Sequence, residues 1–500
     1  MTTDVDLIRR MNAVRSPFTR GPWYAALKLH PERENVVSLV DEHKHAELRS
    51  RMSPGYSGKE NLHLEQDIDE QLLNMFDLIN RKYVTRPEKG RFCMMDLSQV
   101  TSFFTLDAIS KIAFGQTFGF LDRDEDPFGY LKNLEQFLPA IIVFGVYTEL
   151  TKILKIPLMK AVLPKSTDKR GLGRVMGFAR DRVQERFGHK AIVRQDMLGS
   201  FINHGLTQGE LESETITQIT AGSDSTASSL RLTLHFICTS PPVLARLLAE
   251  IHSAIEAGKI SRPVIRDSEA RQLPYLQACI KEGLRMYPPV TGLMAKLVPT
   301  AGVTIDVDGV EKFVPGGVQI AWNTWGIMRR LEIFGPDVEV FRPERWLPRD
   351  ESEAEKARVA RMTDTVGLCF GYGRFGCLGR GVATMELNKA IIEVSGQLQH
   401  VVVNDGLVMT SNMLADFAPL QPSTGQPGQA LQRNGGRLLR PYRHEFRGHR
   451  APRNARRQRA RKRLRSRSRC ASGRVRRIIR RSLNVLQLLR RSYSWRINFV

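Results

Sequence analysis

The chain has 500 residues, of which 75 are basic and 52 acidic, so its formal net charge at pH 7 is +23. The surplus lies at one end, because 24 basic side chains and one acidic side chain follow residue 432, and 51 of each sign precede it. The body of the chain therefore lacks the charge signature of a nucleic-acid-binding protein, while its length allows a large apolar core.

The cysteines and the N-terminal residues indicate what kind of protein this is and in which compartment it folds. The six cysteines are scattered and none forms a Cys-x-x-Cys pair, which argues against a disulfide framework or a common zinc site and favours a reducing compartment. The first residues are polar and acidic, so no signal peptide is predicted. No apolar stretch reaches about eighteen residues, so no transmembrane helix is predicted, although residues 138–147 are apolar enough to rest on a bilayer surface.

Apolar residues at helical spacing predict a series of helices, over residues 68–83, 97–114, 137–154, 210–239, 244–257, 273–286 and 381–393. The prolines at 241 and 242 are predicted to end the fourth of these helices. Alternating apolar residues over 290–325 predict a small sheet with turns. The pattern degrades after residue 394, residues 419–436 have the composition of a linker, and residues 437–477 are dense in arginine. We therefore expect a mainly α domain with a small β region over residues 1–420 and a linker and low-complexity tail over 421–500.

The most informative motif is the run from Phe370 to Gly379, which holds Cys377 between closely spaced glycines. Glycine lets the backbone turn sharply and approach a flat cofactor, and nearby N–H groups can tune a thiolate. Such a loop suits a cysteine offered to a haem iron, with Phe370 against the macrocycle. The alternative is a buried structural cysteine in a glycine-rich turn.

Glu282 and Arg285 lie one helical turn apart, and a proline-fixed segment downstream carries Arg345. A buried cluster of one acid and two arginines would be stable only if fully paired, and would then fix the loop that carries Cys377. The alternative is a solvated surface pair.

Residues 221–226 interrupt the long helix predicted over 210–239 with a glycine, an acid and two hydroxyls. Ser and Thr bonded to the preceding turn are predicted to open a local bulge, with room for dioxygen and water, and Asp224 with a neighbouring hydroxyl can relay protons. The alternative is a polar helix face. Further upstream, His45 and Arg49 share a helix face and can both donate to a carboxylate, or they form an ordinary surface pair.

In this order, the motifs at 221–226, 282–285, 343–346 and 370–379 resemble the cytochrome P-450 superfamily over about residues 5–394. Residues 11–16, 55–61 and 273–278 resemble fungal microsomal members of the pisatin demethylase type. The resemblance implies the cytochrome P-450 fold and haem b (iron protoporphyrin IX). It also implies a haem-thiolate monooxygenase that inserts one oxygen atom of dioxygen into a small apolar molecule, by hydroxylation or O-demethylation, in fungal secondary metabolism or detoxification.

The resemblance also implies residue roles. Cys377 would be the axial ligand of the haem iron, and the glycines of its loop would support it. Asp224 with Ser225 or Thr226 would deliver protons, and Glu282, Arg285 and Arg345 would form a structural triad. The remaining positions fall into two sets, haem contacts at Phe370, Gly371, Gly373, Arg374, Gly379, His45 and Arg49, and a substrate pocket at Ile216, Ala221, Gly222, Val290 and Leu293.

Partners and location follow from the same resemblance. Electrons would come from NADPH through NADPH–cytochrome P-450 reductase, and the enzyme would lie on the cytosolic face of the endoplasmic reticulum membrane. The N-terminal anchor and first elements of the family find no counterpart here, so a soluble cytoplasmic form is also expected. Nucleic acid is expected as a partner only through the Arg-rich tail.

Two positions depart from the family pattern. Phe375 stands where an arginine or histidine usually contacts a haem propionate, with Arg374 or Arg49 as substitutes, and Ser225 replaces the usual threonine. Both ends of the chain also depart from the family. The alternative function is therefore a catalytically impaired relative from a truncated or mis-spliced gene model, with a tail that binds nucleic acid or an acidic membrane surface.

Overall fold

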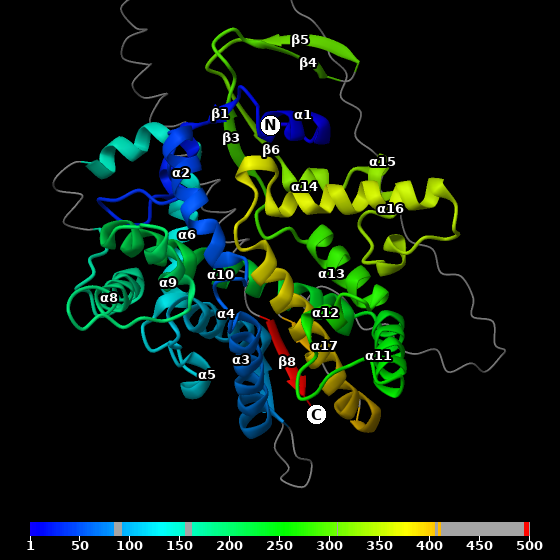
Figure 1. Ribbon diagram of the computed structural model, residues 1–500. Coiled ribbons are helices and arrows are strands. Elements are labelled where there is room, and N and C mark those ends of the chain that lie inside the picture. Colours follow the sequence, from blue (N-terminus) through cyan, green and yellow to red (C-terminus); the bar gives the residue numbers. More distant parts are fainter. Residues whose placement is uncertain (85–92, 156–162, 308, 406–408, 412–494, 500) are drawn as a thin grey trace, which may run out of the picture. The chain divides into compact units, whose positions relative to one another are not determined.

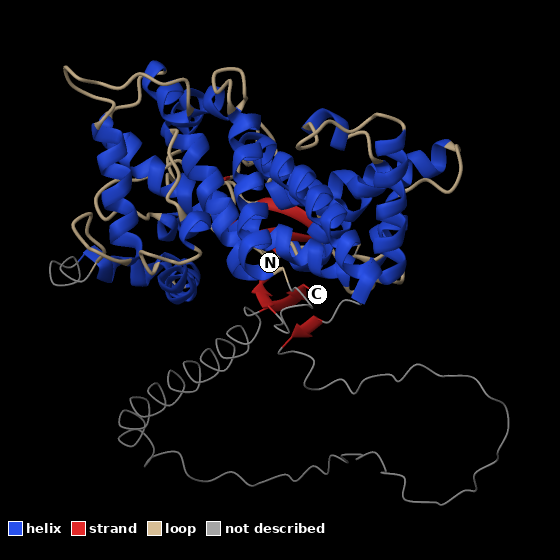
Figure 2. Ribbon diagram, turned by 90° about the horizontal axis from the view of Figure 1, so that it is seen from below, coloured by secondary structure: helices blue, strands red, loops and turns tan. Residues whose placement is uncertain are grey.

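The computed structural model describes residues 1–84, 93–155, 163–307, 309–405, 409–411 and 495–499. Helices make up most of this part of the chain, and its strands are confined to small sheets (Figure 1 and Figure 2). The predicted mainly α fold with a small β region is therefore confirmed.

The chain divides into two compact units, one formed by residues 1–410 with 495–500 and the other by residues 411–494. Every candidate site residue lies in the first unit. The second unit, which includes the predicted linker and the Arg-rich segment 437–477, lies outside the described residues except for Ser411.

The α-helices of the described chain are α1 (Val5–Asn12), α2 (Glu42–Met52), α3 (Leu64–Leu78), α4 (Leu97–Phe114), α5 (Phe120–Arg123), α6 (Tyr130–Val146), α8 (Gly171–Gln184), α9 (Met197–Asn203), α10 (Gln208–Cys238), α11 (Pro241–Glu256), α12 (Asp267–Ala270), α13 (Pro274–Met286), α14 (Thr324–Ile327), α15 (Leu331–Phe334), α16 (Glu353–Val366) and α17 (Arg380–Asp405). Short 3-10 segments are η1 (Pro22–Leu27), η2 (Ser53–Tyr56), η5 (Thr148–Lys155), η6 (Pro343–Trp346), η7 (Gly367–Phe370) and η8 (Gly373–Phe375), and η3 (Ile79–Tyr83) is a π-turn.

The described strands form three small sheets. β1 (Thr19–Arg20), β3 (Leu293–Leu297) and β6 (Gln319–Trp322) are antiparallel in the order β1-β3-β6, and β4 (Val303–Val307) pairs with β5 (Val310–Val314) as a hairpin. In the first sheet Arg20 lies directly opposite Lys296. The third sheet has the order β2-β8-β7, built from Cys93–Asp96, Trp495–Phe499 and Met409–Ser411.

Several helix ends differ from the sequence prediction. The helix predicted over 137–154 is instead α6, which ends at Val146, followed by η5. Pro241 and Pro242 do not stop α10, which already ends at Cys238; they open α11, where the first turn needs no backbone donor. The helix predicted over 381–393 continues to Asp405, and neither β7 nor β8 is predicted from the sequence.

Helix α10 is the element on which the site is built. Thr207 and Glu210 form a capping box at its start, and the helix runs without a change of type to Cys238. It packs against α4, α8, α13 and α17 (Figure 1), so most of its length is buried. A polar side chain that is reached by solvent in the middle of α10 therefore marks a space inside the fold.

The membrane-span criterion of length and apolarity is met by no single helix among the described residues. The pair α10 and α11, which meet at a bend of 103°, meets it only when the two are taken together.

Candidate active site

The cysteine loop connects η7 to α17 through a tight turn. The backbone N–H of Cys377 donates to the carbonyl of Phe370 at 2.7 Å, which closes the turn. Gly373 has a φ of 57°, and a Cβ there would lie 2.2 Å from the carbonyl oxygen of Asn12, so only glycine fits. The loop is therefore held against the end of α1.

The sulfur of Cys377 is exposed, although its loop is surrounded by protein. Burial raises the pKa of the thiol, while the N–H groups of Gly379 and Arg380, which donate to the sulfur, and the Arg49 guanidinium act against this rise. A solvent-reached thiol with N–H donors aimed at it is arranged as the ligand of a metal ion, which displaces the thiol proton on binding. The neighbouring Cys369, by contrast, is buried.

Beside this loop lies a buried group of basic side chains around the ring of Phe375. Lys296 places its Nζ 2.9 Å from the ring centroid, and the guanidinium carbon of Arg20 lies 5.2 Å away. Arg20 and Lys296 are only 5% and 0% exposed and are directly opposed in the β1–β3 pair. Two positive charges in that position would repel each other, so Lys296 can be charged beside Arg20 only if an anion joins the pair.

The protein supplies little of that negative charge. Glu42 accepts from the backbone N–H of Arg20 at 2.6 Å and lies 3.7 Å from Arg374. Within this cluster, three buried nitrogen atoms have no hydrogen-bond partner in the described part of the chain, namely Nε of Arg20, Nε of Arg374 and Nζ of Lys296, while Nη1 of Arg20 donates to the carbonyls of Val36, Val37 and Leu39. Burial, and then the charge of Arg20, lower the pKa of Lys296 to about 6. An iron porphyrin brings two propionate carboxylates, so the residues present fit haem.

The residues predicted to contact the haem propionates differ in their surroundings. His45 is buried and stacks on Phe375, with ring centroids 5.5 Å apart, and burial followed by the charge of Arg20 lowers its pKa to about 3, so it is neutral. The Nη2 atom of Arg374 donates to the carbonyls of Ser16 and Phe18, at 3.3 and 2.9 Å. Burial lowers the pKa of the Arg49 guanidinium, and the Cys377 thiol, with which it interacts electrostatically, acts against this fall. Sequence analysis missed Arg20 and Lys296, and the one available signal was a lysine inside the apolar strand β3.

The middle of α10 holds residues that are reached by solvent. Ala221 is exposed, and Asp224 and Ser225 are partly exposed, whereas Thr226 is buried. The Ser225 hydroxyl donates to the carbonyl of Ala221 at 2.7 Å, as expected for a serine bonded to the preceding turn. The predicted bulge is wrong, however, because the helix continues unbroken through this segment.

The predicted substrate-pocket residues do not all face one way. Val290 is 40% exposed, and Leu293, at the start of β3, has a φ of 75°. Gly222 faces α4, because a Cβ there would lie 3.0 Å from the side chain of Ile109. Ile216 is 1% exposed and packs with Met176 and Ala179 of α8. Of the five predicted positions, Ala221 and Val290 are exposed and Leu293 is half-buried, whereas Ile216 is buried and Gly222 faces α4.

The Glu282 carboxylate lies at the centre of a fully buried ionic cluster. Its two oxygens accept from Nε and Nη2 of Arg285, both at 2.8 Å, and from Nε of Arg345 at 2.9 Å. They also accept from the indole N–H of Trp346 and the backbone N–H of Arg342, both at 2.9 Å. The structure thus brings together the three residues of the predicted triad.

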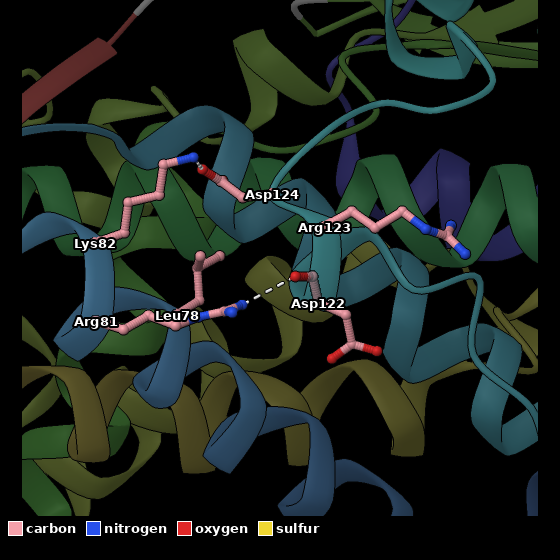
Figure 3. Close-up of a pocket in the computed structure, with 6 residues that line it drawn as sticks. All are labelled: Leu78, Arg81, Lys82, Asp122, Arg123 and Asp124. Carbon is pink, nitrogen blue, oxygen red and sulfur yellow. Dashed lines mark hydrogen bonds and ion pairs between the residues drawn. The ribbon is translucent and has the colours of Figure 1, made fainter.

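A separate small cavity of about 290 Å³ lies between η3 and the segment that follows α5 (Figure 3). Its polar lining residues bond among themselves: Arg81 donates to the carbonyl of Asp122 at 3.0 Å, and Lys82 pairs with Asp124. None of the residues that line this cavity carries a thiol or hydroxyl group, so we do not consider the cavity an alternative to the Cys377 site.

Comparison with known proteins agrees with this geometry. The family model described as cytochrome P450 matches residues 7–403. The chain is 41% identical over 406 residues to the cytochrome P450 monooxygenase ABA1 of Pyricularia oryzae, covering 81% of this chain and 78% of the relative. It is 39% identical over 424 residues to aba1 of Botryotinia fuckeliana (83% and 81%) and 33% identical over 393 residues to abl1 of Leptosphaeria maculans (78% and 67%), both also named cytochrome P450 monooxygenases. The chain therefore belongs to the cytochrome P450 family, and it is a monooxygenase that uses haem, dioxygen, a substrate and a redox partner.

Proposed function

We propose that the protein is a haem-thiolate monooxygenase in which Cys377 supplies the axial thiolate. Its product would be a hydroxylated or O-demethylated small apolar molecule of fungal secondary metabolism or detoxification. The observation that carries the proposal is the exposed Cys377, whose sulfur receives backbone N–H donors beside a basic cluster in which one nitrogen atom each of Arg20, Lys296 and Arg374 has no hydrogen-bond partner. An impaired protein is not favoured, because the family model spans residues 7–403 and the relatives are named monooxygenases.

The haem, when bound, supplies the binding and activation of dioxygen. The side chains of the protein would bind the haem and deliver protons. Cys377 would ligate the iron, and Arg20, Arg49, Lys296 and Arg374 would hold the propionates. In this arrangement Lys296 and Arg20 provide the charge that Phe375 lacks.

Asp224 and Ser225 of α10 would deliver protons. Burial raises the pKa of Asp224, so its carboxyl retains a proton to higher pH than an ordinary aspartate and can donate one. The Ser225 hydroxyl uses its hydrogen on Ala221, which leaves its oxygen free to accept. Thr226 is buried, so we assign the alcohol of the pair to Ser225.

The substrate would lie against Ala221, Val290 and Leu293. These side chains are apolar, which supports a small apolar organic substrate positioned by contact rather than by charge. Electrons would come from NADPH through NADPH–cytochrome P-450 reductase, bound near the cysteine loop.

The membrane assignment rests on α6. Ile142, Val143 and Val146 of α6 and Tyr147, which directly follows the helix, are 54, 40, 53 and 53% exposed, and together they form an apolar face. We place this face on the cytosolic surface of the endoplasmic reticulum membrane. Co-flotation with neutral lipid vesicles should fall when Ile142 and Val146 are both replaced by glutamate, and unchanged flotation would contradict the assignment.

The function is tested by expressing the full chain and recording the spectrum of its reduced carbonyl complex. The strongly red-shifted Soret band of a thiolate-ligated haem is expected, and an imidazole-like or haem-free spectrum would overturn the proposal. With a reductase and labelled dioxygen, one labelled oxygen atom per turnover should enter an apolar substrate, or leave in the aldehyde that O-demethylation releases.

Replacing Lys296 with methionine tests whether this lysine helps to hold a haem propionate. The haem-free protein should become more stable by about 1 kcal/mol, because a buried amine without a partner is removed. Haem should nevertheless transfer to excess apomyoglobin at least about tenfold faster, because a propionate loses its cation. Lys281→Met is the matched control, since Lys281 also lies over an aromatic ring, 6.0 Å from that of Trp346, outside the cluster. Equal rates of haem transfer from the two variants would show that Lys296 does not bind a haem propionate.

A further inference from the structure

The loop formed by residues 35–39, which precedes α2, holds the guanidinium of Arg20. Nη1 of Arg20 donates to the carbonyls of Val36, Val37 and Leu39, at 2.9, 3.1 and 2.7 Å. Because a single guanidinium nitrogen is shared by three carbonyls of one loop, the position of the guanidinium depends on the position of that loop.

The same loop is fastened to α10 by a buried glutamate. The backbone N–H of Val36 donates to Oε1 of Glu214 at 2.6 Å, while the carbonyl of Val36 accepts from Arg20. Glu214 is 1% exposed, and its Oε2 atom has no hydrogen-bond partner in the described part of the chain. Burying an oxygen atom without a partner costs stability, so packing alone does not account for a glutamate at this position.

The Glu214 side chain is mostly neutral at pH 7. Burial raises its pKa to about 8, with the Val36 N–H acting against the rise and Glu210 adding to it. A neutral carboxyl group still accepts a hydrogen bond through its carbonyl oxygen, and glutamine has nearly the same shape and can accept in the same place. The bond to Val36 therefore needs an acceptor at this position and does not need a charge.

We infer that Glu214 is a positioning residue, which fixes the 35–39 loop and thereby holds the Arg20 guanidinium where it binds a haem propionate. The inference rests on the proposed function, in which Arg20 is one of the propionate cations. Every step from Glu214 to Arg20 is a hydrogen bond between named atoms. Since α10 continues without a break from Glu214 to Ser225, the same helix would fix the haem edge and carry the residues that deliver protons.

The test follows the transfer of haem to excess apomyoglobin and the resonance Raman bands of the haem propionates, using the haem-loaded full chain. Glu214→Leu should transfer haem about fivefold faster, because the loop loses its bond to α10 and Arg20 is held less firmly. It should also shift the propionate bands in the same direction as Arg20→Met. Glu214→Gln keeps the acceptor and should leave both measurements close to those of the parent protein.

Two comparisons separate this role from a general structural one. In the Arg20→Met background, Glu214→Leu should cause no further increase in haem transfer, whereas two independent effects would multiply. Glu212→Leu is the matched control, because it breaks the ion pair between α10 and Arg33 but leaves the Val36 bond in place, and it should transfer haem at the parent rate.

Glu214→Asp, which is shorter by one methylene group, should give a smaller change in the same direction and serves if Glu214→Leu does not fold. Unchanged haem transfer and propionate bands in this variant series, or an equal increase in transfer with and without Arg20, would overturn the inference and leave the proposed function intact. Unchanged haem transfer and propionate bands in Arg20→Met would instead show that Arg20 does not hold a propionate, which overturns the proposed function at that residue and the inference with it.

Discussion

Replacing Glu282 with alanine is expected to lower the free energy of unfolding by about 3–5 kcal/mol and to leave little haem-loaded protein. The carboxylate is 0% exposed and is bonded to two guanidiniums that are 0% and 2% exposed. Its removal leaves Arg285 buried without an anion and leaves Arg345 paired with Asp337 alone, at 3.0 Å. Thermal unfolding and the haem content of purified protein provide the measurement.

Two further variants sharpen this prediction. Glu353→Ala removes an exposed ion pair with Lys356, at 3.1 Å, and should change stability by less than about 0.5 kcal/mol. Replacing the whole triad with apolar residues should not rescue the fold, because the arginines also bond the backbone that follows α14, at the carbonyls of Met328, Phe334, Asp337, Val338 and Val340. A Glu282→Ala protein with near-normal stability would mean that the cluster is not needed for the fold.

Replacing Cys377 with alanine should abolish the thiolate spectrum of the reduced carbonyl complex and reduce product formation to background. The sulfur is the group that would donate charge to the iron, and neither alanine nor a neutral serine supplies it. The folded protein should survive, because Cys377 is exposed and no packing is lost.

Cys369→Ala is the matched control. Cys369 lies in the same loop region but is buried, with its sulfur 3.7 Å from the carbonyl of Leu284. We expect this variant to keep its spectrum and activity and to lose only a small packing contribution. A normal thiolate spectrum from Cys377→Ala would require a different axial ligand and contradict the proposed site.

Sequence patterns located the parts of the site whose partners are set by local spacing. Glu282 and Arg285 are one turn apart, and the turn around Cys377 is encoded by its glycines, so both could be found without a structure. The pairing of Arg20 with Lys296 depends on the register of two strands more than 270 residues apart, which no local pattern contains.

The sequence also could not show which way the side chains of α10 point. The family resemblance assigned Ile216, Gly222 and Thr226 to the site, but which way each side chain points depends on how α10 packs against α4 and α8. The end of α17 was placed too early for a similar reason, because the apolar pattern fades before the helix stops at Asp405.

The fit of Gly373 against Asn12, and the bonds from Arg374 to Ser16 and Phe18, have a consequence for how the protein is made. The two arginine bonds join residues 358 and 356 positions apart in the chain. During synthesis the N-terminal residues leave the ribosome first, and they must wait until the cysteine loop has emerged before these contacts form. The N-terminal segment therefore completes its packing only after the cysteine loop, more than 350 residues downstream, has been synthesised.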